Sequence, residues 1–149
     1  AVMIGWGYGN NNYSSIALGD AAGAYSDESL HVIFNSDALQ MYVTGQGNSN
    51  FYKDNEYHHL VVTAGVNNYS IWVDGVELSF VFASGSQSTW LPELVGYNSN
   101  ITAQVGQRTY GGGSGNFDGE IPVMKVYNRV LTDEEILRNY KAYKNRFGI

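Results

Sequence analysis

Apolar and β-branched residues occur in short runs along most of the chain, and polar, glycine-rich stretches separate these runs. Such runs predict β-strands, and the clusters of Asn, Asp, Ser and Gly between them predict turns. The clearest pair flanks Asp74-Gly75, which favours a two-residue turn with positive φ at both central positions. The predicted strands cover residues 2–6, 13–18, 30–34, 38–43, 57–64, 69–73, 76–82, 101–107 and 117–128.

Two regions depart from this simple pattern. Residues 83–100 lack clear periodicity, so we expect a long loop with room for one short strand. Pro122 lies inside the last predicted strand, and its missing N–H predicts an edge or a bulge at that point. Both features are typical of a sheet protein with irregular connections.

One helix is predicted at the C-terminal end. Thr132 and Glu135 have the spacing of a capping box, and Leu131 and Ile136 can form the accompanying hydrophobic staple. Acidic residues in the first turn and basic residues in the last turn match the helix dipole. Four side chains then share one face at helical spacing: Ile136, Tyr140, Tyr143 and Phe147.

This pattern predicts an all-β fold, an antiparallel jelly-roll sandwich with one short C-terminal helix. The 149 residues contain no repeat or linker, so we expect a single domain over 1–149. The chain has no cysteine, which excludes disulfides, thiol catalysis and Cys-based zinc sites. It also has no apolar run of the roughly 18 residues that a membrane helix needs, so membrane insertion is not expected.

The net charge of −6 is unevenly distributed. Residues 1–124 carry two basic and eleven acidic side chains, whereas residues 125–149 carry six basic and three acidic ones. The acidic body would repel nucleic acid, so a nucleic-acid partner is not expected. The basic end coincides with the predicted helix and is explained as its solvated face.

Two separated motifs resemble the laminin G-like and concanavalin A-like lectin/glucanase superfamily. The first is YHHLVVTAGVNNYSIWVDGVELSF at 57–80, with an aromatic-His-His start before a hairpin closed by Asp-Gly. The second runs from VGQR at 105–108 through a glycine loop to FDGEIPVMKVYNRVLTDEEILRNY at 117–140. Together they cover residues 57–149, and the resemblance implies a lectin-like β-sandwich.

The resemblance carries two further expectations. The ending KAYKNRFGI is similar to the ends of such domains in structural proteins of tailed bacteriophages and in secreted microbial proteins. Family members usually have one or two more strands ahead of residues 2–6, and this chain starts directly with an apolar run. We therefore expect that the domain has been processed or truncated, or that another chain completes it.

The sequence favours a non-catalytic protein. Asp118 and Glu120 have the i, i+2 spacing of glucanase carboxylates, but no third acid follows and Gly119 separates them. His58 and His59 are adjacent, so on a strand they point to opposite faces and cannot share one metal. The resemblance implies that this pair has a structural role.

Calcium is the one cofactor that the resemblance suggests, because related domains often hold an ion through loop oxygens. The candidate ligands in polar stretches are Asp20, Asp27 and Asp54, and solvated carboxylates are the alternative. Carbohydrate binding would need an aromatic platform with polar partners for the sugar hydroxyls. The candidates for this site are Tyr8, Tyr13, Trp90, Tyr97 and Tyr110, with Arg108 and Asn116.

Two functions remain open. The first is a non-catalytic lectin-like module that binds glycans or a cell surface. The second is an assembly subunit, such as a phage decoration or fibre protein, with neighbouring subunits as partners in a homo- or hetero-oligomer. A glycoside hydrolase ranks below both, and the expected location is extracellular or on a virion surface.

Overall fold

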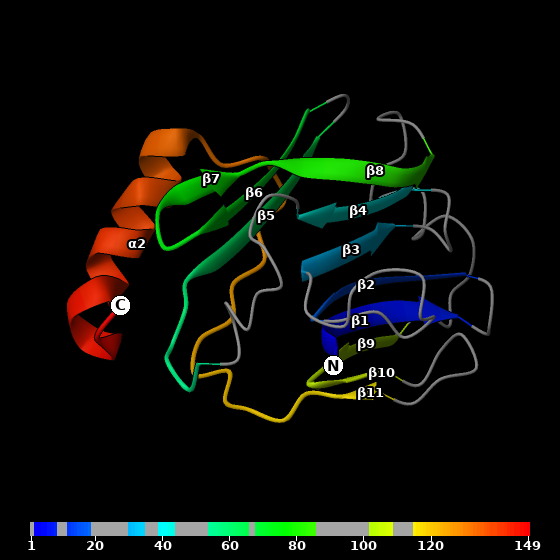
Figure 1. The fold of residues 1–149 in the computed structure, drawn as a ribbon, viewed down its shortest axis with the longest axis horizontal. Helices are drawn as coiled ribbons and strands as arrows, with labels where there is room; N and C mark the ends of the chain where they lie inside the picture. The colour runs from blue at the N-terminus through cyan, green and yellow to red at the C-terminus, as the bar shows by residue number, and fades with distance from the viewer. Residues whose placement is uncertain are drawn as a thin grey trace.

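The computed structural model describes residues 2–8, 12–18, 30–34, 39–43, 54–65, 68–85, 102–108 and 115–149. The described strands form antiparallel sheets, and a single described helix follows them near the C-terminus (Figure 1). In the described residues, no helix is long and apolar enough to cross a membrane.

The larger sheet has six strands in the order β8-β4-β3-β2-β1-β9. Each neighbouring pair is antiparallel, including the hairpin predicted over 30–34 and 38–43. Four of its strands agree closely with the predicted ranges because their apolar runs end at polar turn residues. The strands are β1 (Val2–Tyr8), β2 (Asn12–Leu18), β3 (Leu30–Phe34), β4 (Leu39–Val43), β8 (Phe80–Gly85) and β9 (Thr102–Val105).

The smaller sheet has three strands, β5 (Leu60–Gly65), β6 (Asn68–Val73) and β7 (Val76–Leu78). The turn between β6 and β7 has φ 51° at Asp74 and φ 77° at Gly75, so the predicted turn with two positive φ values is confirmed. A two-stranded ladder of β10 (Gln107–Arg108) and β11 (Gly115–Asn116) lies beside β1.

Two of the predicted strands are each split in the structure into two strands that belong to different ladders. The run predicted over 76–82 breaks at Ser79, so that β7 pairs with β6 in the small sheet and β8 pairs with β4 in the large one. The run predicted over 101–107 breaks at Gly106, which has φ 75°. Both breaks follow from a change of strand partner, which depends on strands that are distant in the sequence.

The strand predicted over 117–128 is wrong. The ladder in this region ends at Asn116, and no residue from 117 to 131 belongs to a strand. Pro122 cannot donate to a ladder, and a β-favouring sequence becomes a strand only where a partner strand lies in register. The segment instead passes from Glu120 beside Tyr57 to Val130 beside Gly65.

The core between the two sheets makes the fold an antiparallel sandwich. Ile71 of the small sheet and Leu30 of the large sheet are almost fully buried in one cluster. Burying each aliphatic side chain of this size contributes about 1.5–3 kcal/mol. The other members and neighbours of the cluster are Tyr69, Val73, Leu78, Ile16, Leu60, Val62, Ala64 and Phe80.

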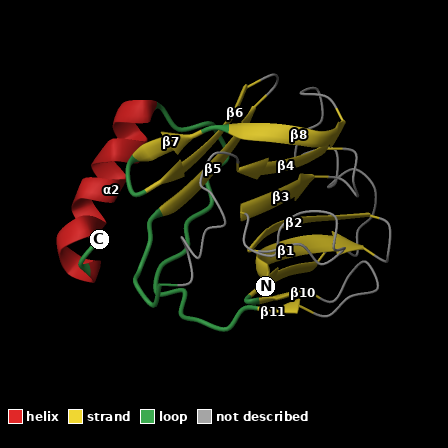
Figure 2. Ribbon diagram, viewed as in Figure 1, coloured by secondary structure: helices red, strands yellow, loops and turns green. Residues whose placement is uncertain are grey.

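The opposite face of the small sheet packs against helix α2 (Asp133–Phe147), which forms a separate layer (Figure 2). Trp72 is buried there with Leu131 and Ile136, and the predicted staple of Leu131 and Ile136 is confirmed. The indole N–H of Trp72 donates to the Ser70 hydroxyl at 3.0 Å, so burying the indole leaves no unpaired polar atom.

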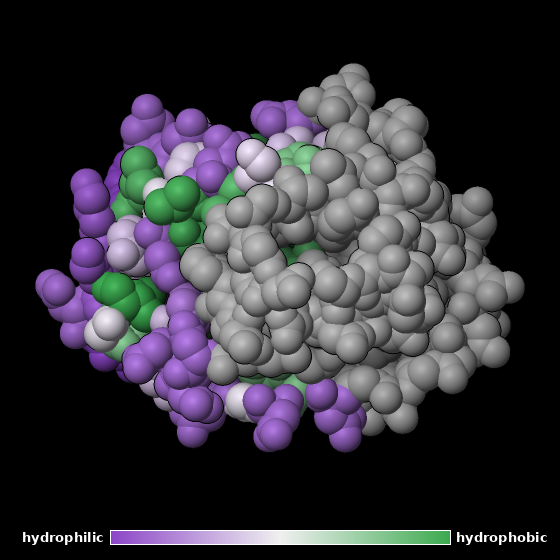
Figure 3. All heavy atoms as spheres, viewed as in Figure 1, coloured by the Kyte–Doolittle hydropathy of each residue, from purple (hydrophilic) through white to green (hydrophobic). Residues whose placement is uncertain are grey.

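The N-terminal end of α2 confirms the predicted capping box. The hydroxyl of Thr132 accepts from the Glu135 amide at 3.3 Å, and the Glu135 carboxylate accepts from the Thr132 amide at 3.0 Å. Gly148 closes the helix with φ 75° and donates its N–H to the Lys144 carbonyl at 2.9 Å. Around this helix and the small sheet, apolar side chains reach the surface among hydrophilic ones (Figure 3).

Candidate functional site

The strand ends opposite α2 gather at one end of the large sheet, which we call the loop end. The antiparallel register fixes this arrangement, because the last residue of one strand pairs with the first residue of its neighbour. In Figure 1 this end lies at the right and α2 at the left. The loop end is defined by the pairs Tyr8↔Asn12, Gly7↔Thr102, Phe34↔Leu39 and Leu39↔Gly85.

The predicted sugar-binding residues Tyr8 and Tyr13 lie in strands at the loop end. Tyr8 is the last residue of β1, and Tyr13 pairs with Gly7. Arg108 and Asn116 lie in the β10–β11 ladder, which contacts β1 and β9 and opens toward the same end (Figure 1). The side chain of Asn116 is exposed.

The other three candidates, Trp90, Tyr97 and Tyr110, lie outside the described residues. Trp90 and Tyr97 lie between Gly85 and Thr102 in the sequence, and both of these flanking residues belong to the loop end. Tyr110 falls between Arg108 and Gly115, which pair at the open end of their ladder. The topology therefore places both flanks of the segment with Trp90 and Tyr97 at the loop end, whereas the flanks of Tyr110 belong to the β10–β11 ladder.

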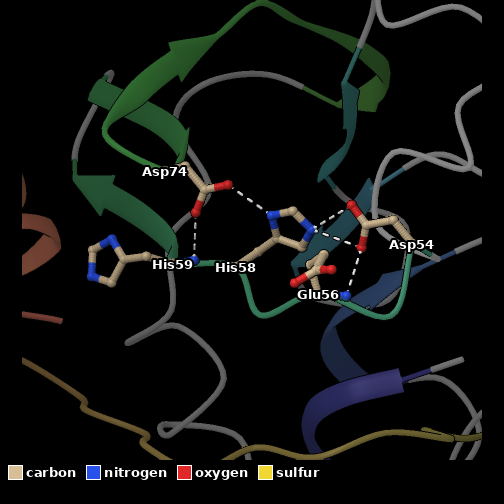
Figure 4. A network of polar contacts seen from close by, with 5 residues as sticks. All are labelled: Asp54, Glu56, His58, His59 and Asp74. Atoms are coloured by element: carbon tan, nitrogen blue, oxygen red, sulfur yellow. Dashed lines mark hydrogen bonds and ion pairs between the residues drawn. The ribbon is translucent and has the colours of Figure 1, made fainter. Parts of the chain in front are cut away.

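A second polar constellation joins three residues beside the small sheet (Figure 4). His58 lies between two carboxylates, with Nδ1 2.7 Å from Asp74 Oδ2 and Nε2 3.1 Å from Asp54 Oδ2. Asp74 Oδ1 also accepts from the His59 amide at 2.8 Å, and the Asp74 amide donates to the His59 carbonyl at 3.0 Å. Asp74 thereby ties the β6–β7 turn to the start of β5.

Asp54, His58 and Asp74 together form what we call the clamp. Its electrostatics favour a charged His58 imidazole. Partial burial lowers the pKa of His58, but the hydrogen bonds to Asp74 and Asp54 outweigh this effect and raise its pKa above the usual value. The backbone amide of Glu56 and then the His58 ring lower the pKa of Asp54. The three groups therefore form a carboxylate–imidazolium–carboxylate bridge.

Because Asp54 belongs to the clamp, it is poorly suited to the calcium role that the sequence suggested. Its oxygens already accept from the Glu56 amide and face His58 Nε2, and a cation would compete with the imidazolium. Among the described residues, no group of three or more His, Asp or Glu side chains could hold a metal ion. Asp20 and Asp27 lie outside the described residues.

His59 points away from His58, toward α2 (Figure 4). Its ring lies 6.0 Å from the Tyr140 ring and 6.2 Å from the Tyr143 ring, measured between centroids. Burial lowers the pKa of His59, and among the described residues its buried Nδ1 atom has no hydrogen-bond partner. The predicted opposite orientation of the two histidines is confirmed, and both rings hold elements together.

Asp118 and Glu120 are both exposed beyond the end of β11. The Tyr57 hydroxyl donates to Glu120, and this bond raises the pKa of Tyr57. Tyr57 in turn packs on Phe147 of α2, with 5.4 Å between ring centroids. Glu120 therefore helps to hold the C-terminal helix.

Sequence reasoning missed the clamp because its members were assigned to separate features. Asp74 was explained by the turn, and Asp54 by a polar loop. The available signal was the i, i+4 spacing of Asp54 and His58, together with a carboxylate in the neighbouring turn.

The two packed antiparallel sheets define a β-sandwich domain, and several of its strand ends meet at the loop end. The family profile described as the concanavalin A-like lectin/glucanases superfamily, of the laminin G type, matches residues 6–137. The chain belongs to this superfamily. Searches among curated proteins and among solved structures gave no significant match.

Proposed function

We propose that this domain is a non-catalytic, lectin-like recognition module that binds glycans on an extracellular or virion surface. The proposal rests on one observation: the sheet register puts Tyr8, Tyr13 and both flanks of the segment that contains Trp90 and Tyr97 at the loop end. Membership of the lectin/glucanase superfamily supports it. The proposal includes jelly-roll connectivity for the sandwich.

The chemistry follows from the residue types at the loop end. A tyrosine or tryptophan ring can cover the C–H face of a sugar, and Arg108 and Asn116 can bond its hydroxyls. Tyr8, Tyr13, Arg108 and Asn116 lie on paired strands, which limits the entropy that a ligand must remove on binding them.

The test is a glycan array followed by titration of the best ligand by calorimetry. Tyr8→Ala and Tyr110→Ala are expected to weaken binding at least tenfold, whereas Tyr127→Ala is the matched control because it removes an exposed tyrosine near α2. Circular dichroism checks the fold of each variant. Absence of any glycan binding, or equal losses in all three variants, would contradict the proposal.

The non-catalytic part of the proposal has its own test. Purified protein is expected to release no reducing sugar from laminarin-type β-glucans. Hydrolysis that disappears in Glu120→Gln, with Glu77→Gln as the exposed control, would replace the recognition module by a glycoside hydrolase.

A second candidate function is that of a structural subunit, such as a phage decoration or fibre protein. One observation favours it: Met124 and Val126 are 50% and 79% exposed in a run that also exposes Val123 and Tyr127. Such apolar exposure is typical of interaction sites. Regular particles or fibres of the purified protein in electron microscopy would support this candidate, and a monomer that binds glycans would contradict it.

A further inference from the structure

The chain contains two Asp-Gly pairs, Asp74-Gly75 and Asp118-Gly119. Asp-Gly is the aspartyl sequence most prone to isomerisation, because glycine has no Cβ atom to hinder attack of its backbone nitrogen on the aspartate side chain. The reaction requires that the carboxyl group and the following amide can approach each other. The two pairs share this chemistry, so their surroundings in the structure decide which of them reacts.

The clamp holds the first pair in an unreactive arrangement. Asp74 Oδ1 accepts from the His59 amide at 2.8 Å, and Oδ2 lies 2.7 Å from His58 Nδ1, so both carboxyl oxygens are engaged (Figure 4). Gly75 is fixed in the turn with φ 77° and lies against the Tyr140 ring. The Asp74 carboxyl can therefore turn to the Gly75 nitrogen only if the clamp and the turn open.

The second pair has none of these restraints. Asp118 and Gly119 are both exposed and lie outside any helix or strand. Within the part of the chain that the structure describes, neither the Asp118 carboxylate nor the Gly119 amide makes a hydrogen bond or an ion pair. A Cβ atom at Gly119 would lie 2.7 Å from Phe117 Cε1, so packing favours glycine at the position that makes Asp118 reactive.

We propose that Asp118-Gly119 is a site of spontaneous isomerisation to isoaspartate, and that the clamp protects Asp74-Gly75 from the same reaction. The Gly119 nitrogen attacks Cγ of Asp118, a bond forms between them, and the carboxyl OH leaves with the amide hydrogen as water. Water then opens this five-membered imide at the former main-chain carbonyl and breaks its bond to the Gly119 nitrogen. The main chain afterwards runs through Cγ, the α-carboxylate is free, and the mass is unchanged.

Isomerisation at Asp118 has a consequence for the C-terminal helix, because it adds one methylene to the main chain. The chain is fixed on both sides of this point, by the β10–β11 ladder before it and by the bond between Glu120 and Tyr57 after it. Tyr57 packs on Phe147 of α2, with 5.4 Å between ring centroids. The added atom shifts Glu120 relative to Tyr57, so the reaction weakens this support of α2.

Peptide mapping of the folded, full-length protein tests the proposal. Trypsin separates the two pairs, because residues 54–108 contain Asp74 and residues 109–125 contain Asp118. After incubation at neutral pH, chromatography with electron-transfer fragmentation distinguishes isoaspartate from aspartate in each peptide. Isoaspartate is expected to accumulate at least tenfold faster at Asp118 than at Asp74. No isoaspartate at Asp118, or equal rates at the two sites, would overturn the proposal.

Incubation of the same protein unfolded in guanidinium chloride separates the effect of the fold from that of the neighbouring residues. Unfolding removes the hydrogen bonds of Asp74 to His58 and His59. The rates at Asp74 and Asp118 are therefore expected to become similar. A tenfold difference that persists in the unfolded chain would assign it to local sequence and overturn the protective role of the clamp.

Asp118→Glu is the matched variant, because it keeps the carboxylate but must form a less favourable six-membered ring. The isomerised product at this position is expected to fall at least tenfold. Thermal melts then test the consequence for α2: incubated wild-type protein is expected to melt at a lower temperature than fresh protein, whereas incubated Asp118→Glu is not. An equal loss in both proteins, or an unchanged melt of wild-type protein rich in isoaspartate, would overturn the link to α2.

Discussion

Nδ1 of His58 lies 2.7 Å from Oδ2 of Asp74, and this contact joins the segment before β5 to the turn between β6 and β7. Asp74 adopts φ 51°, so the residue that makes the turn also supplies the carboxylate of the clamp. Asp tolerates this left-handed conformation better than most residues. One side chain therefore fixes a local turn and a contact between segments.

We predict that Asp74→Asn lowers the free energy of unfolding by about 1 kcal/mol, because the amide keeps the turn but loses the charge that faces His58. Urea unfolding at a pH near 6 measures the change. Asp118→Asn, at an exposed carboxylate, is the control and should have little effect. An unchanged unfolding midpoint in Asp74→Asn would show that the clamp contributes nothing.

The clamp should also make stability depend on pH. Because the folded-state pKa of His58 is raised, its contribution is complete below the unfolded value of about 6.5 and is lost as pH rises through the folded pKa. The stability difference between the wild-type protein and His58→Gln is therefore expected to be larger near pH 6 than near pH 9. A difference that is constant over this range would contradict the prediction.

Protonation of His59 has the opposite effect on the stability of the domain. Burial lowers its folded-state pKa, so the protein loses stability as pH falls from about 6.5 through the folded pKa. We predict that His59→Phe stabilises the domain by about 1 kcal/mol at neutral pH, because it removes the unpaired Nδ1 atom and keeps the ring contacts with Tyr140 and Tyr143. The gain should increase toward pH 5 in thermal melts, and His58→Phe should destabilise the protein instead.

Substitutions at Gly75 and Gly106 distinguish the cost of backbone strain from the cost of a steric clash. A Cβ atom at Gly75 would lie 2.6 Å from Tyr140 Cδ1, whereas a Cβ at Gly106 would have nothing within 4 Å, and φ is similar at the two positions. We predict that Gly106→Ala costs about 1 kcal/mol from strain and Gly75→Ala about 1–3 kcal/mol more. Equal losses in chemical unfolding would mean that Tyr140 moves aside without cost.

Much of the local structure was predictable because a few neighbouring residues determine it. Asp74-Gly75 fixes its turn through backbone conformation, and Thr132 with Glu135 fixes the start of α2 through two hydrogen bonds. The staple of Leu131 and Ile136 acts in the same way. These interactions lie within six residues of each other, so a single sequence contains all the information they need.

The candidate site was predictable only in part. Aromatic and amide residues could be selected by chemistry, but only the register between strands distant in the sequence shows that Tyr8 and Tyr13 lie at the same end of the sheet as Gly85 and Thr102. The role of Asp54 in the clamp was not predictable, because a polar loop residue gives no sign of which distant carboxylate or imidazole it meets.

The sequence by itself determined the antiparallel strands, the Asp-Gly turn, the capped helix and membership of the lectin/glucanase superfamily. Only the tertiary structure decided that the run 76–82 serves two sheets and that the run 117–128 forms no strand. The physical reason is that a strand requires a partner for its backbone hydrogen bonds. Side-chain periodicity shows that a segment can pair, and the positions of the other strands decide whether it does.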